Sequence, residues 1–139
     1  MEKEMINQLI DTAIHQLKYS YTPYSNFKVG AALLAKNGQV YTGCNIENAG
    51  YTATNCAERT AFFKAVSEGV KDFQAICVVG GKAGVLTEYA APCGVCRQVM
   101  AEFCDPKAFR VLMARTETDY RECSLEEVLP FGFTKEELQ

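Results

Sequence analysis

Two short stretches constrain this chain more than any other feature: Cys56-Ala57-Glu58 and Pro92-Cys93-Gly94-Val95-Cys96. Together they offer three thiolates and one carboxylate. Three thiolates suit Zn²⁺, and three protein ligands rather than four leave one coordination position open, as in catalytic zinc sites. A carboxylate two residues from a ligand is well placed to move a proton of a water molecule at that position. The two stretches therefore predict a catalytic zinc site in which Glu58 moves protons.

The composition is that of one globular domain spanning residues 1–139. Hydrophobic residues make up 48% of the chain and charged residues 22%, and a chain of 139 residues is long enough to bury a core. Fourteen basic residues against seventeen acidic ones give a net charge of -3. This balance argues against nucleic acid as a partner, because affinity for a phosphate backbone comes largely from Lys and Arg.

The N-terminal segment Met1–Tyr19 is amphipathic and charged, and no apolar run is long enough to span a bilayer. We therefore expect a cytoplasmic protein that does not enter a membrane. Seven cysteines are an odd number, and no export signal is visible. In a reducing compartment, clustered cysteines are metal ligands or small buried apolar residues rather than disulfides.

Hydrophobic periodicity predicts a mixed α/β layer in which helices cover a sheet. Expected helices cover residues 3–19, 56–68 and 93–103, with a short one opening at the capping box of residues 124–127, and expected strands cover 28–35, 39–44, 73–80 and 110–114. Asn37-Gly38 predicts a two-residue hairpin turn between the first two strands. Thr54 and Asn55 are the expected caps of the second helix.

This reading places all three thiols of the two stretches near helix N-termini. Cys56 lies in the first turn of one helix, and Cys93 and Cys96 are neighbours on one face of the next. Unpaired N–H groups and the positive end of the helix dipole favour the thiolate form there. The remaining cysteines are expected to pack in the interior: Cys44, Cys77, Cys104 and Cys123. Cys44 is the least certain of these exclusions, because it directly precedes the polar segment at Asn45.

Three further residues have two interpretations each. Asn45 and Glu47 alternate about Ile46, so in an extended segment they face one side and suit vicinal hydroxyls such as those of a ribose. The same segment is equally typical of a polar turn. Phe27, at the start of the first strand, is either a core aromatic, which the composition favours, or a face on which a flat base stacks.

At this point the motifs resemble those of zinc nucleoside deaminases. Cys56-Ala57-Glu58 and Pro92-Cys93-Gly94-Val95-Cys96-Arg97-Gln98 match the all-cysteine form of that signature. Phe27-Lys28-Val29-Gly30-Ala31-Ala32 and Gly43-Cys44-Asn45-Ile46-Glu47-Asn48-Ala49 are similar to the small homotetrameric class of cytidine deaminases. The resemblance covers nearly the whole chain, in the order of the family, and implies a three-layer α/β/α fold.

The resemblance also implies a role for each matching residue. Cys56, Cys93 and Cys96 hold one Zn²⁺ per subunit, and Glu58 is the proton shuttle. For the base, the resemblance implies contacts from Phe27 and from the backbone of Ala57, and for the ribose it implies contacts from Asn45 and Glu47. It also implies that three residues reach a neighbouring subunit's site: Ala49, Tyr51 and Phe133. Arg59 is implied as a partner of the thiolates. Phe131-Gly132, inserted between Pro130 and Phe133, departs from the family pattern, as does a long loop before Pro92.

The activity that the resemblance implies is hydrolytic deamination of cytidine and deoxycytidine to uridine and deoxyuridine, with ammonia released, in pyrimidine salvage. Zinc-bound hydroxide attacks C4 of the base while Glu58 carries protons to the ring and to the leaving amine. A carboxylate beside the ribose, Glu47, predicts a preference for nucleosides over nucleotides. Two alternatives stay open: a deaminase of blasticidin S-type antibiotics, and a structural zinc module that binds a partner and has a fourth ligand.

Overall fold

The middle layer of the molecule is a five-stranded mixed sheet with the strand order β2-β1-β3-β4-β5. The computed structural model describes all of residues 1–139. Its strands are β1 Phe27–Ala35, β2 Val40–Cys44, β3 Phe73–Lys82, β4 Arg110–Thr116 and β5 Asp119–Ser124. All neighbouring strands are antiparallel except β3 and β4. A parallel pair needs a crossover connection, and here the connection contains a helix.

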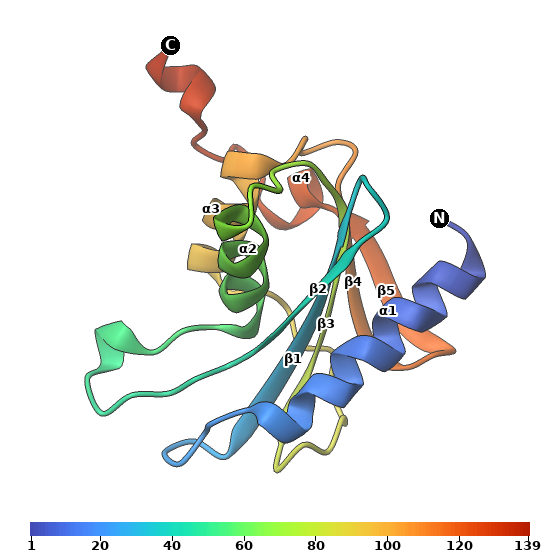
Figure 1. The fold of residues 1–139 in the computed structure, drawn as a ribbon, viewed down its shortest axis with the longest axis vertical. Helices are drawn as coiled ribbons and strands as arrows, with labels where there is room; N and C mark the ends of the chain where they lie inside the picture. Colours follow the sequence, from blue (N-terminus) through green and yellow to red (C-terminus); the bar gives the residue numbers. More distant parts are fainter.

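Helices cover both faces of this sheet (Figure 1). Helix α1, Lys3–His15, packs on one face, while α2, Ala57–Ser67, and α3, Gly94–Phe103, lie on the other. A short helix, α4, Leu125–Val128, follows β5. Short 3₁₀ helices complete the chain at Gln16–Tyr19, Tyr51–Ala53 and Lys135–Leu138. The three-layer α/β/α prediction is confirmed. None of the helices has the length and apolar character that crossing a membrane requires.

Side-chain alternation along β1 explains why the core has two halves. Successive side chains of a strand point to opposite faces, so Leu33 and Leu34 enter different clusters. Leu34 packs with the buried stripe of α1, which is Ile6, Leu9, Ile10 and Ala13. Leu33 packs with the residues of α2 and α3, around the fully buried Phe62. The half on the α2 and α3 side is the one beneath the paired cysteine stretches.

Three local expectations were wrong. The turn between β1 and β2 consists of the three residues 36–38, since Ala35 N–H donates to the Gln39 carbonyl, and only Gly38 has a positive φ, whereas the expected two-residue turn needs positive φ at both central positions.

Strand β5 was not expected, because its sequence Asp-Tyr-Arg-Glu-Cys-Ser is too polar to show an apolar pattern. A polar edge strand of this kind is common because charged side chains discourage pairing with other molecules. The N-cap of α2 is Cys56 rather than Thr54 or Asn55, and its side chain makes no capping hydrogen bond. The sulfur of Cys56 therefore does not cap the helix and is available for other contacts.

Gly43 allows α2 to approach the sheet closely. A Cβ atom at this position would lie 2.1 Å from the carbonyl oxygen of Ala57 and 2.7 Å from the backbone nitrogen of Ala61. Only a residue without a side chain lets strand and helix meet at this distance. Gly43 thereby sets the position of the first turn of α2, which carries Cys56 and Glu58.

Candidate metal centre

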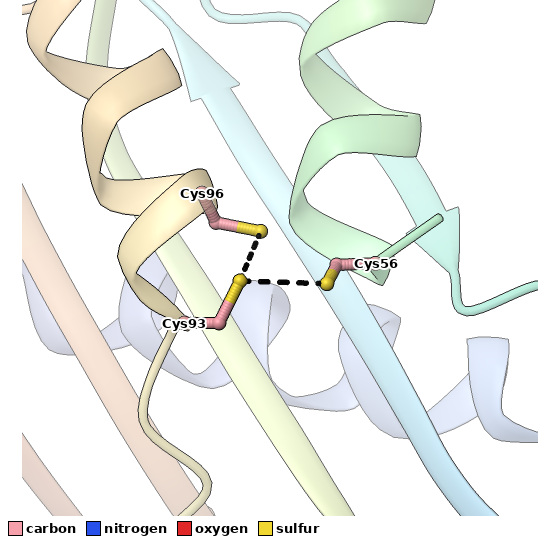
Figure 2. A group of neighbouring side chains, drawn as sticks. All are labelled: Cys56, Cys93 and Cys96. Carbon is pink, nitrogen blue, oxygen red and sulfur yellow. Dashed lines mark hydrogen bonds between the residues drawn. The ribbon is translucent and has the colours of Figure 1, made fainter. Parts of the chain in front are cut away.

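The three predicted ligands converge at the N-termini of two neighbouring helices (Figure 2). Cys56 is the N-cap of α2, Cys93 is the N-cap of α3, and Cys96 lies in the first turn of α3. The Cys56 and Cys93 sulfurs are 3.6 Å apart, and the Cys93 and Cys96 sulfurs are 3.5 Å apart. All three sulfurs lie within 4.8 Å of one another.

These distances fit a tetrahedral zinc ion. Zn–S bonds of about 2.3 Å at tetrahedral angles place two sulfurs about 3.8 Å apart. No fourth Cys, His, Asp or Glu belongs to this group, and the other four cysteines lie elsewhere. Burial raises the pKa of the Cys77 thiol to about 12, as expected of an inert packing residue. The donor set therefore suits zinc with one coordination position left for another ligand.

Negative charge is distributed unequally among the three cysteines of this group. The neighbouring Cys96 thiol, assisted by Arg59, lowers the pKa of Cys56 to about 5. The reverse holds for Cys96, whose pKa is raised by the neighbouring Cys56 thiolate and by burial. Arg59 Nη2 donates to Cys56 Sγ at 3.2 Å, while its Nε atom is buried without a hydrogen-bond partner. Arg59 thus places a positive charge directly against a predicted metal ligand, and groups in this outer position tune metal sites.

Glu58 is a buried carboxyl group beside this group of cysteines. Its exposed fraction is 3%, and desolvation raises its pKa to about 7. A carboxyl group of this kind exchanges protons readily near neutral pH, which is what a general acid and base requires. The structure therefore combines three sulfur donors with one carboxyl group that is suited to proton transfer.

A cavity of about 410 Å³ opens onto these residues. Its volume falls in the range typical of small-molecule sites. The lining comes from four stretches: Phe27 and Val29, then Asn45 and Glu47, then Thr54, Asn55, Cys56, Ala57 and Glu58, and finally Tyr89, Ala90, Ala91 and Cys93. A larger hollow of about 830 Å³, between the end of α3 and the C-terminal segment, contains none of the predicted site residues. The chemistry therefore belongs to the smaller cavity.

Four predicted substrate residues line this cavity: Phe27, Asn45, Glu47 and Ala57. The Phe27 side chain is 42% exposed, so it is not a core aromatic. The amide of Asn45 is already engaged with β1: Val29 N–H donates to its Oδ1 at 3.0 Å, and its Nδ2 donates to the Phe27 carbonyl at 2.8 Å. Asn45 therefore fixes the start of β1 as well as lining the cavity.

Glu47 holds the loop of residues 21–26. Its Oε1 accepts from the backbone N–H groups of Tyr24 and Ser25, at 3.0 Å and 3.1 Å, and its Oε2 accepts from the Ser25 hydroxyl. The Ser25 hydroxyl is the main cause of a lowered pKa at Glu47, which keeps this carboxylate ionised. The cavity thus carries a fixed negative charge at Glu47.

Three predicted residues lie outside the cavity of their own chain. Ala49 is exposed, and Tyr51 is 86% exposed beside a separate small hollow next to Glu47. Phe133 is 58% exposed in the C-terminal segment, which extends away from the body of the molecule (Figure 1). Their assignment to a neighbouring subunit's site stays a prediction.

Sequence reasoning missed the wall formed by Tyr89, Ala90 and Ala91. These residues belong to the long loop before Pro92, and they show neither periodicity nor a recognisable pairing of residue types. Their position two to four residues before Cys93 was the one available signal. Val29, Thr54 and Asn55 were missed for a similar reason, because each adjoins a predicted residue without having a distinctive side chain of its own.

Comparison with known proteins gives a consistent result. The sequence model described as "Cytidine and deoxycytidylate deaminase zinc-binding region" matches residues 3–113. A cytidine deaminase of Sporosarcina psychrophila is 48% identical over 133 residues, covering 96% of this chain and 94% of its own. A blasticidin-S deaminase of Bacillus cereus is 27% identical over 132 residues, covering 92% and 91% of the two chains.

A solved structure agrees with these relatives. The crystal structure of a cytidine deaminase from Burkholderia pseudomallei superposes with a TM-score of 0.82 at 45% identity, covering 91% of this chain and 97% of that one. The match therefore covers nearly the whole of both chains rather than a fragment. The chain belongs to the cytidine and deoxycytidylate deaminase family.

Proposed function

We propose that this protein deaminates cytidine and deoxycytidine hydrolytically, giving uridine or deoxyuridine and ammonia. The observation that carries the proposal is the buried Glu58 carboxyl in the same cavity as Cys56 and Cys93, in a chain of the deaminase family. A structural zinc site has four protein ligands, and no fourth donor belongs to this cysteine group.

Cys56, Cys93 and Cys96 would hold the ion, and bound zinc supplies the acidity that makes hydroxide available from water near neutral pH. Glu58 accepts the proton that this ionisation releases and donates it to ring atom N3, which makes C4 electrophilic. The oxygen of the water forms a bond to C4, and Glu58 carries the second proton of the water to the amino group. The C4–N bond then breaks, which leaves a carbonyl group at C4 and releases ammonia. A carboxyl group with a pKa of about 7 suits both directions of transfer.

The remaining lining residues orient the nucleoside. Phe27 contacts the base ring, and the backbone of the buried Ala57 contacts the base edge. Asn45 and Glu47 bind the ribose hydroxyls with the donor and acceptor capacity that their contacts to β1 and to residues 24–25 leave free. The negative charge of Glu47 disfavours substrates with a phosphate on the ribose.

The working unit that we propose is a cytoplasmic homotetramer with one zinc per subunit, serving pyrimidine salvage. Aromatic side chains exposed in the C-terminal segment support an assembly, because isolated domains seldom expose such groups together: Phe131 and Phe133. In this assembly Phe133, Ala49 and Tyr51 complete a neighbouring subunit's cavity. Nucleic acid is not a substrate, as expected of a chain with a net charge of -3.

The test is to mix the zinc-loaded protein with cytidine or deoxycytidine and follow ammonia release and the loss of cytosine absorbance. Both nucleosides should be turned over, with one ammonia formed per cytosine lost. If the folded, zinc-loaded protein leaves both untouched, the proposal fails. Blasticidin S is the comparison substrate, and turnover of the antibiotic without turnover of the nucleosides would assign the site to the antibiotic instead.

A further inference from the structure

The loop of residues 83–91 forms one wall of the substrate cavity, through Tyr89, Ala90 and Ala91. It starts with two residues of positive φ, Ala83 at 55° and Gly84 at 82°. Its own backbone hydrogen bonds are confined to short-range turns at residues 84, 85 and 87. Contacts with other parts of the molecule must therefore decide where this wall stands.

Two sets of hydrogen bonds anchor the loop, in addition to the packing of Leu86 and Ala90 against the two halves of the core. At its start, Ala83 N–H donates to the Asn26 carbonyl at 2.7 Å. Further along, Arg115 Nη1 donates to the Thr87 carbonyl at 2.9 Å, and the Tyr89 hydroxyl donates to Asp119 Oδ1. Arg115 and Asp119 belong to the β4–β5 hairpin, which contributes no residue to the cavity.

The hairpin residues are themselves tied together. Asp119 Oδ2 accepts from Arg115 Nε at 2.7 Å and from Arg115 Nη2 at 2.5 Å, which leaves Oδ1 for Tyr89. The guanidinium carbons of Arg115 and Arg121 lie 5.1 Å and 4.5 Å from the Tyr89 ring centroid, within range of cation–π attraction. We call Tyr89, Arg115, Asp119 and Arg121 the clamp.

We propose that Asp119 and Arg115 are positioning residues for the substrate cavity, and that they act through Tyr89 by holding the loop of residues 83–91 in its binding position. The proposal rests on the proposed function, since it assigns the cavity to a nucleoside. A wall that is already ordered spares the substrate the cost of ordering it on binding. The clamp therefore contributes to affinity rather than to the chemical step.

The cysteines do not depend on the clamp. Pro92, which separates the loop from Cys93, has an anchor of its own, because its carbonyl accepts from Arg97 Nε at 2.7 Å. Arg97 belongs to α3, the helix that carries Cys96. Loosening the clamp should consequently move Tyr89 and leave the zinc ligands in place.

The test compares Asp119→Asn and Tyr89→Phe with Glu122→Gln. Glu122 is the matched control because it forms the other ion pair of the same hairpin, with Arg110 Nε at 2.8 Å, and does not touch the loop. We expect the KM for cytidine to rise about tenfold or more, because Tyr89→Phe removes a hydrogen bond to a charged group and Asp119→Asn removes the charge, with kcat within about twofold and zinc content unchanged. Glu122→Gln should behave as the wild type.

A second readout does not depend on turnover. Protease cleavage after Glu88, within the loop, should be faster in Asp119→Asn than in the wild type or in Glu122→Gln. The proposal is overturned if the clamp variants match the control in both KM and cleavage, or if kcat and zinc content fall together with the rise in KM. If the wild type has no activity on nucleosides, the proposed function fails, and the cleavage rates alone decide whether the clamp holds the loop.

Discussion

At the scale of single residues, the site separates into groups that carry charge and groups that hold the charged groups in place. In the proposed reaction, Glu58 and the cysteines would supply the chemistry from two helix N-termini. Arg59 would offset the negative charge of three thiolates, which would otherwise make the zinc ion a weaker Lewis acid. Glu47 is held by Tyr24 and Ser25, so its carboxylate faces the cavity with a fixed position and charge.

Arg59→Ala should lower turnover of cytidine more than it lowers zinc content. The hydrogen bond from Arg59 to Cys56 is charge-assisted, and such bonds contribute about 1.5–3 kcal/mol, so kcat should fall about tenfold or more. Steady-state kinetics and zinc analysis of the same preparation check this. Arg110→Ala is the control, since that arginine pairs with Glu122 on the sheet edge. If Arg59→Ala turns over cytidine at the wild-type rate, Arg59 has no role in tuning the metal site.

Glu47→Gln should narrow the preference for cytidine over cytidine monophosphate. The wild-type carboxylate repels the phosphate, and the neutral amide does not, although it still accepts hydrogen bonds from residues 24 and 25. We expect the ratio of the two kcat/KM values to shrink by at least about threefold, measured at low ionic strength where charge effects are largest. A ratio close to one in the wild type would contradict the role assigned to Glu47.

At the scale of elements, the site depends on how α2 and α3 are attached to the rest of the fold. Gly43 sets the distance between β2 and α2. Arg97 and Gln98 attach α3 to three other segments: Arg97 donates to the carbonyls of Pro92 and Val128, and Gln98 donates to that of Phe133. The helix that supplies two of the cysteines therefore also fixes the origin of the C-terminal segment.

Gly43→Ala should destabilise the fold and displace Cys56. Its methyl group would meet backbone atoms of α2 that cannot rotate away, so the cost should reach about 3 kcal/mol and lower the Tm by about 8 °C or more. Thermal unfolding of the purified protein measures this. Gly94→Ala is the matched control, because a Cβ atom there would meet nothing within 4 Å. Equal melting temperatures for the two variants would show that β2 and α2 do not meet as described.

At the scale of the whole molecule, zinc would join two helices that are distant in the sequence. Cys56 belongs to α2, whereas Cys93 and Cys96 belong to α3. An ion that binds this arrangement more tightly than the unfolded chain stabilises the folded state by mass action. Metal content and stability should therefore change together.

Removing zinc with a chelator should lower the Tm of the wild type by about 8 °C or more, since a ligand present at a thousand times its Kd contributes about 4 kcal/mol. Cys93→Ala should lose this zinc-dependent difference. Cys123→Ala should keep it, because Cys123 lies outside the cysteine group. Calorimetry with and without chelator decides the matter, and a difference of the same size in all three proteins would contradict a site at Cys93.

The sequence predicted the parts of this molecule that depend on local patterns. The α1 stripe and the pairing of β1 with β2 in a hairpin follow from periodicity and turn chemistry, although the two-residue form of the turn was wrong. The cysteine group follows from spacing at helix N-termini. Strand β5 and the Tyr89 wall could not be predicted in this way. The position of Tyr89 depends on Asp119, thirty residues away on an unexpected strand, and such contacts leave no local pattern.

The central claim is that Glu58 carries the protons of a hydrolytic deamination at the cysteine site. The most direct test is the rate of ammonia release from cytidine by zinc-loaded wild type and zinc-loaded Glu58→Gln, with equal zinc content established for both. Because proton transfer by a positioned side chain contributes about 10²–10⁴-fold, Glu58→Gln should lose at least about a hundredfold in kcat while it keeps its fold and its metal. A zinc-loaded Glu58→Gln that releases ammonia at the wild-type rate would contradict the account.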